Sequence, residues 1–150
     1  MELHPDVGAV VEFEQARDAL AAGRTLAALV HVEKALSLKD NPSWYSYLGY
    51  CIAKQRGQIK KGIELCLSSL EREPDEPIHY LNLGKINLLS GNKPEALKIF
   101  REGMLRGGNE EIKRILNEIG VRKPPPISFL PRDNPLNRLF GILFSKMGFR

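Results

Sequence analysis

The chain has 150 residues, of which 43% are apolar, and this is enough for one domain with a hydrophobic core. Its 22 basic and 18 acidic residues leave a formal net charge of only +4, so charge alone does not indicate nucleic-acid binding. The first residues lack a basic segment followed by an apolar run, and no stretch reaches the ~20 apolar residues of a transmembrane helix. We therefore expect neither a secretory signal nor a membrane span, and a cytoplasmic protein.

From residue 10 onward, amphipathic stretches alternate with glycines and prolines. The helices expected in chain order are 10–22, 25–38, 43–55, 59–71, 77–89 and 93–105. Gly23, Gly57 and Gly91 each separate two of these helices, at turns where glycine adopts a positive φ at little cost. Prolines at 42, 74 and 77 mark the junctions between successive pairs, because proline interrupts a running helix but suits a first turn.

The three glycines are 34 residues apart, and the residues around them repeat with the same period. Small residues recur at Ala28, Gly62 and Ala96 and again at Ala35, Ser69 and Gly103. Large apolar residues recur at Leu29, Ile63 and Leu97, at Val32, Cys66 and Phe100, and at Leu36, Leu70 and Met104. The small residues would allow the paired helices to approach closely, and the large ones would fill the contact between them. The sequence thus predicts three copies of an antiparallel helix pair.

The stretches "YSYLGYCI" and "YLNLGKIN" resemble the tetratricopeptide repeat family, whose pattern is aromatic-x-x-Leu-Gly-x-x-Tyr, then Ala-x-x-x-Phe, then proline. The matching positions are Tyr80, Leu83, Gly84, Ala96 and Phe100 in the third unit and Tyr45, Leu48, Gly49 and Pro74 in the second. In the first unit Glu12 replaces the aromatic residue and Ala16 the glycine, which suits a terminal unit. The resemblance covers residues 9–108 and implies an all-α, right-handed superhelix of three helix pairs with a concave binding face.

A seventh helix is expected in "GNEEIKRILNEIG". Asn109 is a suitable N-cap, and Glu110 and Glu111 place negative charge in the first turn. Ile112, Ile115, Leu116 and Ile119 form one apolar stripe. The resembled family commonly ends in such a capping helix, and here it would cover the helix at 93–105.

Residue clusters typical of enzymes are scarce. The three histidines have no cysteine or second histidine at helical spacing, so no metal site is predicted. Cys51 and Cys66 lie in apolar contexts and are expected to be free thiols. No phosphate-binding glycine motif occurs, and no cofactor is expected. We interpret the protein as non-enzymatic.

The resemblance implies that the first helix of each pair lines the concave face. Arg17, Tyr50 and Lys85 fall at equivalent positions in these helices, and Glu14, Tyr47 and Asn82 lie three residues earlier on the same helical face. Tyrosines offer flat apolar contact, an asparagine can bond a peptide backbone, and cations can bind carboxylates. We expect these six residues to bind a peptide, although Tyr47 or Tyr50 could instead pack between repeats.

Two segments follow the predicted repeat domain at 1–120. Residues 121–134 contain three consecutive prolines and should be extended. Residues 135–150 carry large apolar side chains at helical spacing and should form an amphipathic helix. This tail could pack on its own repeats, mediate a homodimer or dock on another protein, or lie on a membrane surface. If the extended part runs along the concave face, it occupies the binding site itself.

The sequence therefore predicts an adaptor or assembly factor that binds a protein or peptide partner on its concave face. The tail could occupy this face in its own chain. The alternative is a basic helical protein associated with nucleic acid or with a membrane surface. Its basic residues include Lys54, Arg56, Lys60 and Lys61, but no stacking motif accompanies them.

Overall fold

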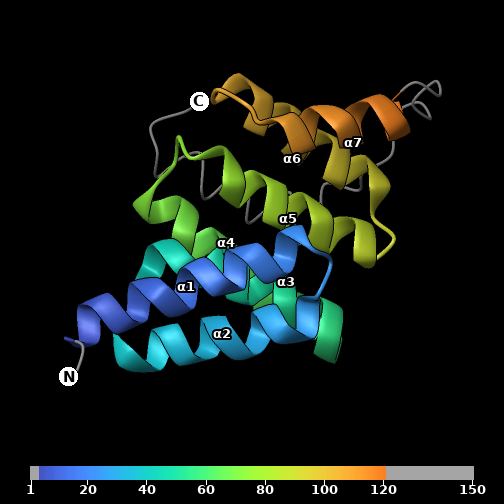
Figure 1. Ribbon diagram of the computed structural model, residues 1–150. Helices are drawn as coiled ribbons and strands as arrows, with labels where there is room; N and C mark the ends of the chain where they lie inside the picture. Colours follow the sequence, from blue (N-terminus) through green and yellow to red (C-terminus); the bar gives the residue numbers. More distant parts are fainter. Residues whose placement is uncertain (1–3, 121–150) are drawn as a thin grey trace.

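The computed structural model describes residues 4–120, and every regular element in this part of the chain is helical (Figure 1). The elements are α1 (Pro5–Ala21), α2 (Thr25–Leu38), a 3₁₀ turn at Pro42–Trp44, α3 (Tyr45–Arg56), α4 (Ile59–Arg72), α5 (Pro77–Leu89), α6 (Lys93–Leu105) and α7 (Glu110–Gly120). The predicted segments 121–134 and 135–150 lie outside the described residues. Within residues 4–120, no helix combines the length and apolarity needed to cross a bilayer.

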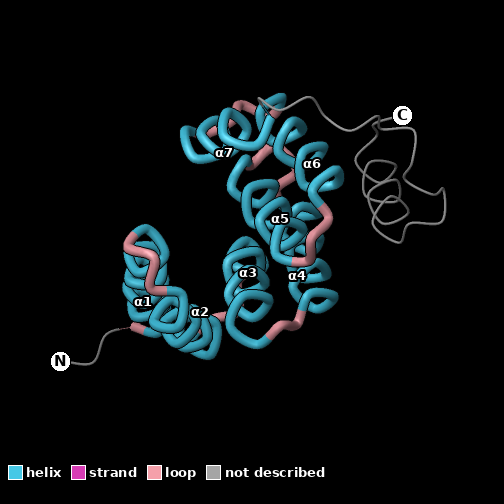
Figure 2. Tube along the Cα trace, turned by 90° about the vertical axis from the view of Figure 1, so that its right-hand side faces the viewer, coloured by secondary structure: helices cyan, strands magenta, loops and turns pink. Residues whose placement is uncertain are grey.

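The helices pack as three consecutive antiparallel pairs, α1 with α2, α3 with α4 and α5 with α6. Each pair turns at a glycine in the left-handed region, with φ of 75° at Gly23, 68° at Gly57 and 81° at Gly91. This confirms the predicted role of the three glycines, because a side chain would be strained there. Successive pairs stack so that α1, α3, α5 and α7 line the concave side, while α2, α4 and α6 form the outer row (Figure 2).

The small residues of the repeat allow the two backbones of a pair to meet. A Cβ atom at Gly49 would lie 2.5 Å from the carbonyl oxygen of Gly62, and a Cβ atom at Gly62 would lie 2.6 Å from that of Gly49. Either distance is a steric clash, so α3 and α4 can cross this closely only with glycine at both positions. In the third pair, the Phe100 ring occupies the space where a Gly84 side chain would project.

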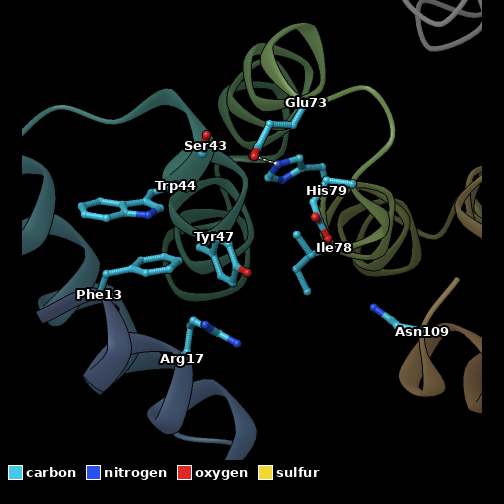
Figure 3. A pocket seen from close by; sticks show the side chains of 10 residues that line it. Phe13, Arg17, Ser43, Trp44, Tyr47, Glu73, Ile78, His79 and Asn109 are labelled. Carbon is cyan, nitrogen blue, oxygen red and sulfur yellow. Dashed lines mark hydrogen bonds and ion pairs between the residues drawn. The ribbon is translucent and has the colours of Figure 1, made fainter. Parts of the chain in front are cut away.

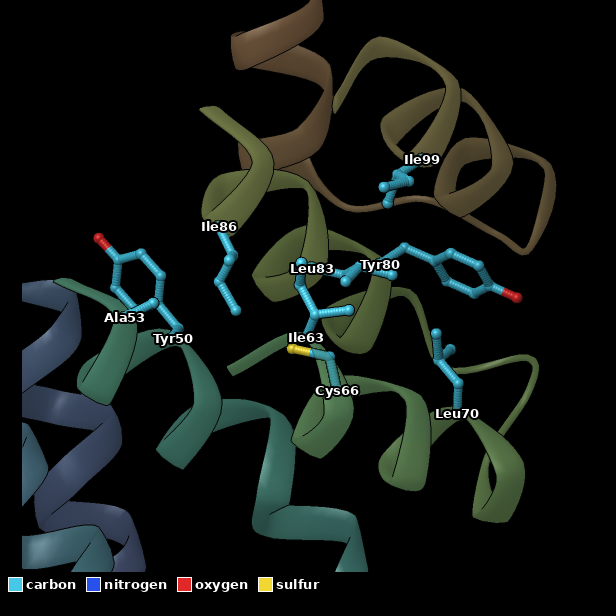
Figure 4. Packing of buried hydrophobic residues seen from close by; sticks show 9 residues of the cluster. All are labelled: Tyr50, Ala53, Ile63, Cys66, Leu70, Tyr80, Leu83, Ile86 and Ile99. Atoms are coloured by element: carbon cyan, nitrogen blue, oxygen red, sulfur yellow. The ribbon is translucent and has the colours of Figure 1, made fainter. Parts of the chain in front are cut away.

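The main core lies between the second and third pairs (Figure 4). Tyr80, Leu83 and Ile86 from α5 pack there against Cys66 and Leu70 from α4, and all five are almost fully buried. Burying a large apolar side chain stabilises the fold by about 1.5–3 kcal/mol. A second cluster joins the first two pairs around Leu29 and Val32. The core is therefore a chain of inter-helix contacts, as expected for stacked repeats.

Helix α7 covers the end of the stack, as predicted. The Asn109 side chain caps it by accepting a hydrogen bond from the backbone N–H of Ile112 at 2.8 Å. Ile112 and Ile115 are buried against Ala96 and Phe100 of α6. The apolar face of the last repeat is thereby removed from water.

Helix α1 begins five residues earlier than the predicted start at residue 10. Pro5 occupies its first turn, and the Nδ1 atom of His4 accepts a hydrogen bond from the N–H of Asp6 at 3.3 Å. Ala9 is buried in a cluster with Ala35 and Trp44, which fixes the added turns to the rest of the fold.

Candidate peptide-binding cleft

A cleft of about 430 Å³ opens on the concave side (Figure 3). It is lined by Phe13 and Arg17 of α1, Ser43, Trp44 and Tyr47 around the start of α3, Glu73 and Glu76 between α4 and α5, Ile78 and His79 of α5, and Asn109 before α7. All three helix pairs and the approach to the capping helix thus contribute side chains. A ligand in this cleft would contact every repeat.

Three aromatic rings form one wall of the cleft. Phe13 stacks on Trp44 with ring centroids 4.6 Å apart and an interplanar angle of 9°. Tyr47 forms a T-shaped contact with Phe13, with ring centroids 4.8 Å apart and an interplanar angle of 90°. Trp44 ends the 3₁₀ turn and Tyr47 follows one helical turn later, so both project towards α1. We call Phe13, Trp44 and Tyr47 the aromatic wall; it offers flat apolar surface for a partner side chain.

Opposite charges lie on either side of Tyr47. The coulombic influence of Arg17 lowers the pKa of the Tyr47 hydroxyl, while Glu73 and Glu76 raise it. Burial is the largest influence and raises the Tyr47 pKa above its ordinary value, so the hydroxyl stays protonated. Arg17 and Glu76 are exposed. The cleft therefore has a cationic side at Arg17 and an anionic side at the two glutamates.

A buried polar network supports the anionic side. His79 Nε2 lies 2.8 Å from Glu73 Oε1, His79 Nδ1 lies 2.7 Å from Ser46 Oγ, and Asn82 Nδ2 donates to Ser46 Oγ at 3.0 Å. Because a carboxylate only accepts, we assign the His79 proton to Nε2, and the Ser46 hydroxyl then donates to Nδ1. Burial lowers the pKa of His79, and the hydrogen bond to Glu73 opposes this. The contact with His79 orients Glu73. Ser46 is fully buried, so its hydroxyl is not accessible to a ligand.

The structure distributes the six predicted site residues over four environments. Arg17 and Tyr47 lie in the cleft, and Glu14 lies beside Arg17 in a shallow hollow on α1. Lys85 sits with its Nζ 4.7 Å from the Tyr50 ring centroid and 2.9 Å from a Glu111 carboxylate oxygen. Tyr50 and Asn82 are 7% and 3% exposed and pack between repeats. Peptide binding by these six residues stays a prediction.

Most of the remaining cleft residues were missed by sequence reasoning. Phe13 lies one helical turn before Arg17, and Trp44 lies three residues before Tyr47, so the spacing used for the six residues would have reached both. Glu73 and Glu76 come from the junction between α4 and α5, where helical spacing gives no signal. Asn109 was assigned only as a cap.

The described residues form neither a metal site nor a reactive thiol. Residues 4–120 contain no cluster of three or more His, Cys, Asp or Glu side chains able to hold a metal ion. Both cysteines are free and buried. Burial raises the pKa of Cys51 to about 12 and that of Cys66 further still, so both remain protonated and unreactive near neutral pH.

Comparisons with known proteins support the architecture. No protein-family model and no curated protein matches the sequence. Among solved structures, the TPR domain of Sgt2 from Aspergillus fumigatus is similar, with a TM-score of 0.53 and 18% sequence identity over 87% of this chain and 93% of that chain. At this identity the likeness concerns the fold. Together with the three helix pairs and α7, it shows that the chain has the tetratricopeptide-repeat fold, with three repeats and a capping helix.

Proposed function

We propose that this protein is a non-enzymatic interaction module that binds an extended peptide segment of a partner protein in the concave cleft. The observation that carries the proposal is the aromatic wall beside groups that remain available for hydrogen bonding. Asn109 uses its side-chain oxygen to cap α7, which leaves its amide N–H groups for a ligand. Arg17 and the Tyr47 hydroxyl face the same open space (Figure 3). A peptide supplies both apolar side chains and backbone carbonyls for such a surface.

The charge of the cleft favours a peptide over a nucleic acid. Two carboxylates, Glu73 and Glu76, oppose one guanidinium, so a phosphate backbone would meet net repulsion there. The basic residues Lys54, Lys60 and Lys61 lie around the turn between α3 and α4 and do not line the cleft.

The first experiment tests the cleft. A displayed library of random peptides is selected on the full chain, and the affinities of the selected peptides are then measured with variants. We expect Tyr47→Ala and Arg17→Glu each to weaken binding by about tenfold or more, as for anchor residues at interfaces. Arg101→Glu makes the same charge change at an exposed position on α6, outside the cleft, and should leave the affinity unchanged. Selected peptides that bind both cleft variants as tightly as the wild type would overturn the proposal.

The proposed function includes competition by the tail. Residues 124–150 include a proline-rich, apolar segment, and in the proposal this segment reduces the access of outside peptides to the cleft. Truncation after Lys123 should therefore raise the affinity for selected peptides, with circular dichroism confirming that the repeats remain folded. An unchanged affinity in a folded truncation would show that the tail does not compete.

A further inference from the structure

The cleft has two charged sides whose groups remain available for an incoming segment. Among residues 4–120, neither Arg17 nor Glu76 forms an ion pair. One carboxylate oxygen of Glu73 accepts the hydrogen bond from His79 Nε2, and the other oxygen can accept one from a ligand. A segment that fits the cleft would therefore present a cation to the two glutamates and an anion to Arg17.

The aromatic wall adds a third requirement. Phe13 and Trp44 already stack on each other, and Tyr47 completes the surface at the edge of the stack. Ile78 lines the cleft as well. A large apolar side chain, best an aromatic one, would bury its surface between them. The ligand thus combines an aromatic anchor with two neighbouring side chains of opposite charge.

The chain itself contains such a segment in "ISFLPRD", residues 127–133. Phe129 supplies the aromatic anchor, and Arg132 is followed directly by Asp133. In an extended segment, successive side chains point to opposite sides, so these two charges would project towards opposite sides of the cleft. Pro131 disfavours a helical conformation for the residue before it, Leu130.

The part of the chain that connects α7 to this segment is also long enough to return to the cleft. Helix α7 has 11 residues, and Asn109 at its start lines the cleft. At 1.5 Å per residue, α7 carries the chain about 16 Å away from that point. The eight residues from 121 to 128, if extended, would span up to roughly 26–29 Å. This exceeds the length of α7 and is enough to bring Phe129 back to Asn109, which lines the cleft.

We propose that residues 127–133 bind in the cleft of their own chain, with Phe129 against the aromatic wall, Arg132 at Glu73 and Glu76, and Asp133 at Arg17. This inference rests on the proposed function, because it assigns the regulation of the same cleft. A partner peptide would then have to match this pattern in order to displace the tail.

Limited proteolysis of the full chain with thermolysin tests the assignment, because thermolysin cleaves before apolar residues such as Phe129. Mass spectrometry follows cleavage within residues 127–133. We expect slow cleavage in the wild type and cleavage about fivefold faster in Glu76→Arg and in Arg132→Glu, the scale of one exposed ion pair. The double variant Glu76→Arg/Arg132→Glu should return to within about twofold of the wild-type rate, because the pair is restored in reverse.

Glu64→Arg is the matched control, since it reverses an exposed charge on α4 outside the cleft and should keep the wild-type rate. Rapid cleavage in the wild type, or no rescue in the double variant, would overturn the inference. Protection that strengthens with protein concentration would assign the segment to a second copy and would also overturn it. The peptide-binding experiment tests the proposed function separately. That function is overturned if the selected peptides bind equally well without Tyr47 and Arg17, and the cleavage rates do not affect this result.

Discussion

At the residue scale, Gly84 shows how little space the third helix pair leaves. A methyl group there would overlap the Phe100 ring, which is itself fully buried. Gly8 in α1 is different, because a Cβ atom there would lie 3.5 Å from Leu38 Cδ1, an ordinary contact distance. Glycine is therefore required by the packing at position 84 and is not required at position 8.

Gly84→Ala should destabilise the protein by about 1–3 kcal/mol, because the Phe100 ring must move in a close-packed core. Gly8→Ala should leave the free energy of unfolding unchanged or raise it by about 0.5–1 kcal/mol, since alanine favours the helix. Urea denaturation followed by circular dichroism measures both values. Equal effects of the two substitutions would contradict this reading of the packing.

His79 should make stability depend on pH. Its pKa in the folded protein lies below the ordinary value of 6.5, mainly because of burial. In the window between these two pKa values, the unfolded chain binds a proton that the folded chain does not. The free energy of unfolding should therefore be fully retained above pH 6.5 and should fall as the pH drops from 6.5 through the folded pKa.

Denaturation of the wild type and of His79→Gln at about pH 7.5 and about pH 5.5 tests this linkage. The wild type should lose stability at the lower pH, and His79→Gln should show a smaller dependence. A wild type equally stable at both values would argue against protonation of the buried imidazole as a source of destabilisation.

At the scale of the element, α7 is held by one apolar face against α6. Ile112 is fully buried, whereas the next residue, Lys113, is exposed. Ile112→Ala should cost about 2–5 kcal/mol, the usual range for removing a buried aliphatic side chain. Lys113→Ala should stay within about 0.5 kcal/mol of the wild type. Urea denaturation compares them, and a small loss for Ile112→Ala would show that α7 contributes little to the cooperative unit.

The elements differ in how well local sequence predicted them. The six helices from α2 to α7 carry clear periodicity or clear termini, so their positions were predicted closely. The early part of α1 was missed because Val7, Val10 and Val11 are exposed while Ala9 is buried, which blurs its amphipathic pattern. That part of α1 is held by tertiary contacts with Ala35 and Trp44.

At the scale of the whole molecule, the repeats form a stack in which each unit contacts its neighbours. Helices α4 and α5 share the main cluster and are covered on several sides, whereas α7 packs against the stack on one side (Figures 2 and 4). Terminal elements of such stacks open more readily than central ones. Native-state hydrogen exchange should therefore give lower opening free energies for amides of α7 than for those of α4 and α5. Equal protection in all three helices would indicate one all-or-none unit.

The candidate site is built from all three repeats, and the sequence predicted only some of its residues. Tyr47 and Tyr50 lie on one face of α3 by spacing, but Tyr47 turns to the aromatic wall while Tyr50 is buried beside Lys85. Asn82, predicted to bind peptide backbone, donates to Ser46 inside the protein. Helical spacing specifies a direction around one helix axis, and it carries no information on whether a neighbouring helix already occupies that direction.

The sequence by itself determined the repeated helix pair, its glycine turns and the capping helix. These features depend on residues close together in the chain, where steric limits on φ and on helix approach act directly. Only the tertiary structure decided which polar side chains remain accessible and which groups share the cleft. That outcome depends on how successive pairs stack, because Phe13, Glu76 and Asn109 meet across three repeat boundaries that no local pattern connects.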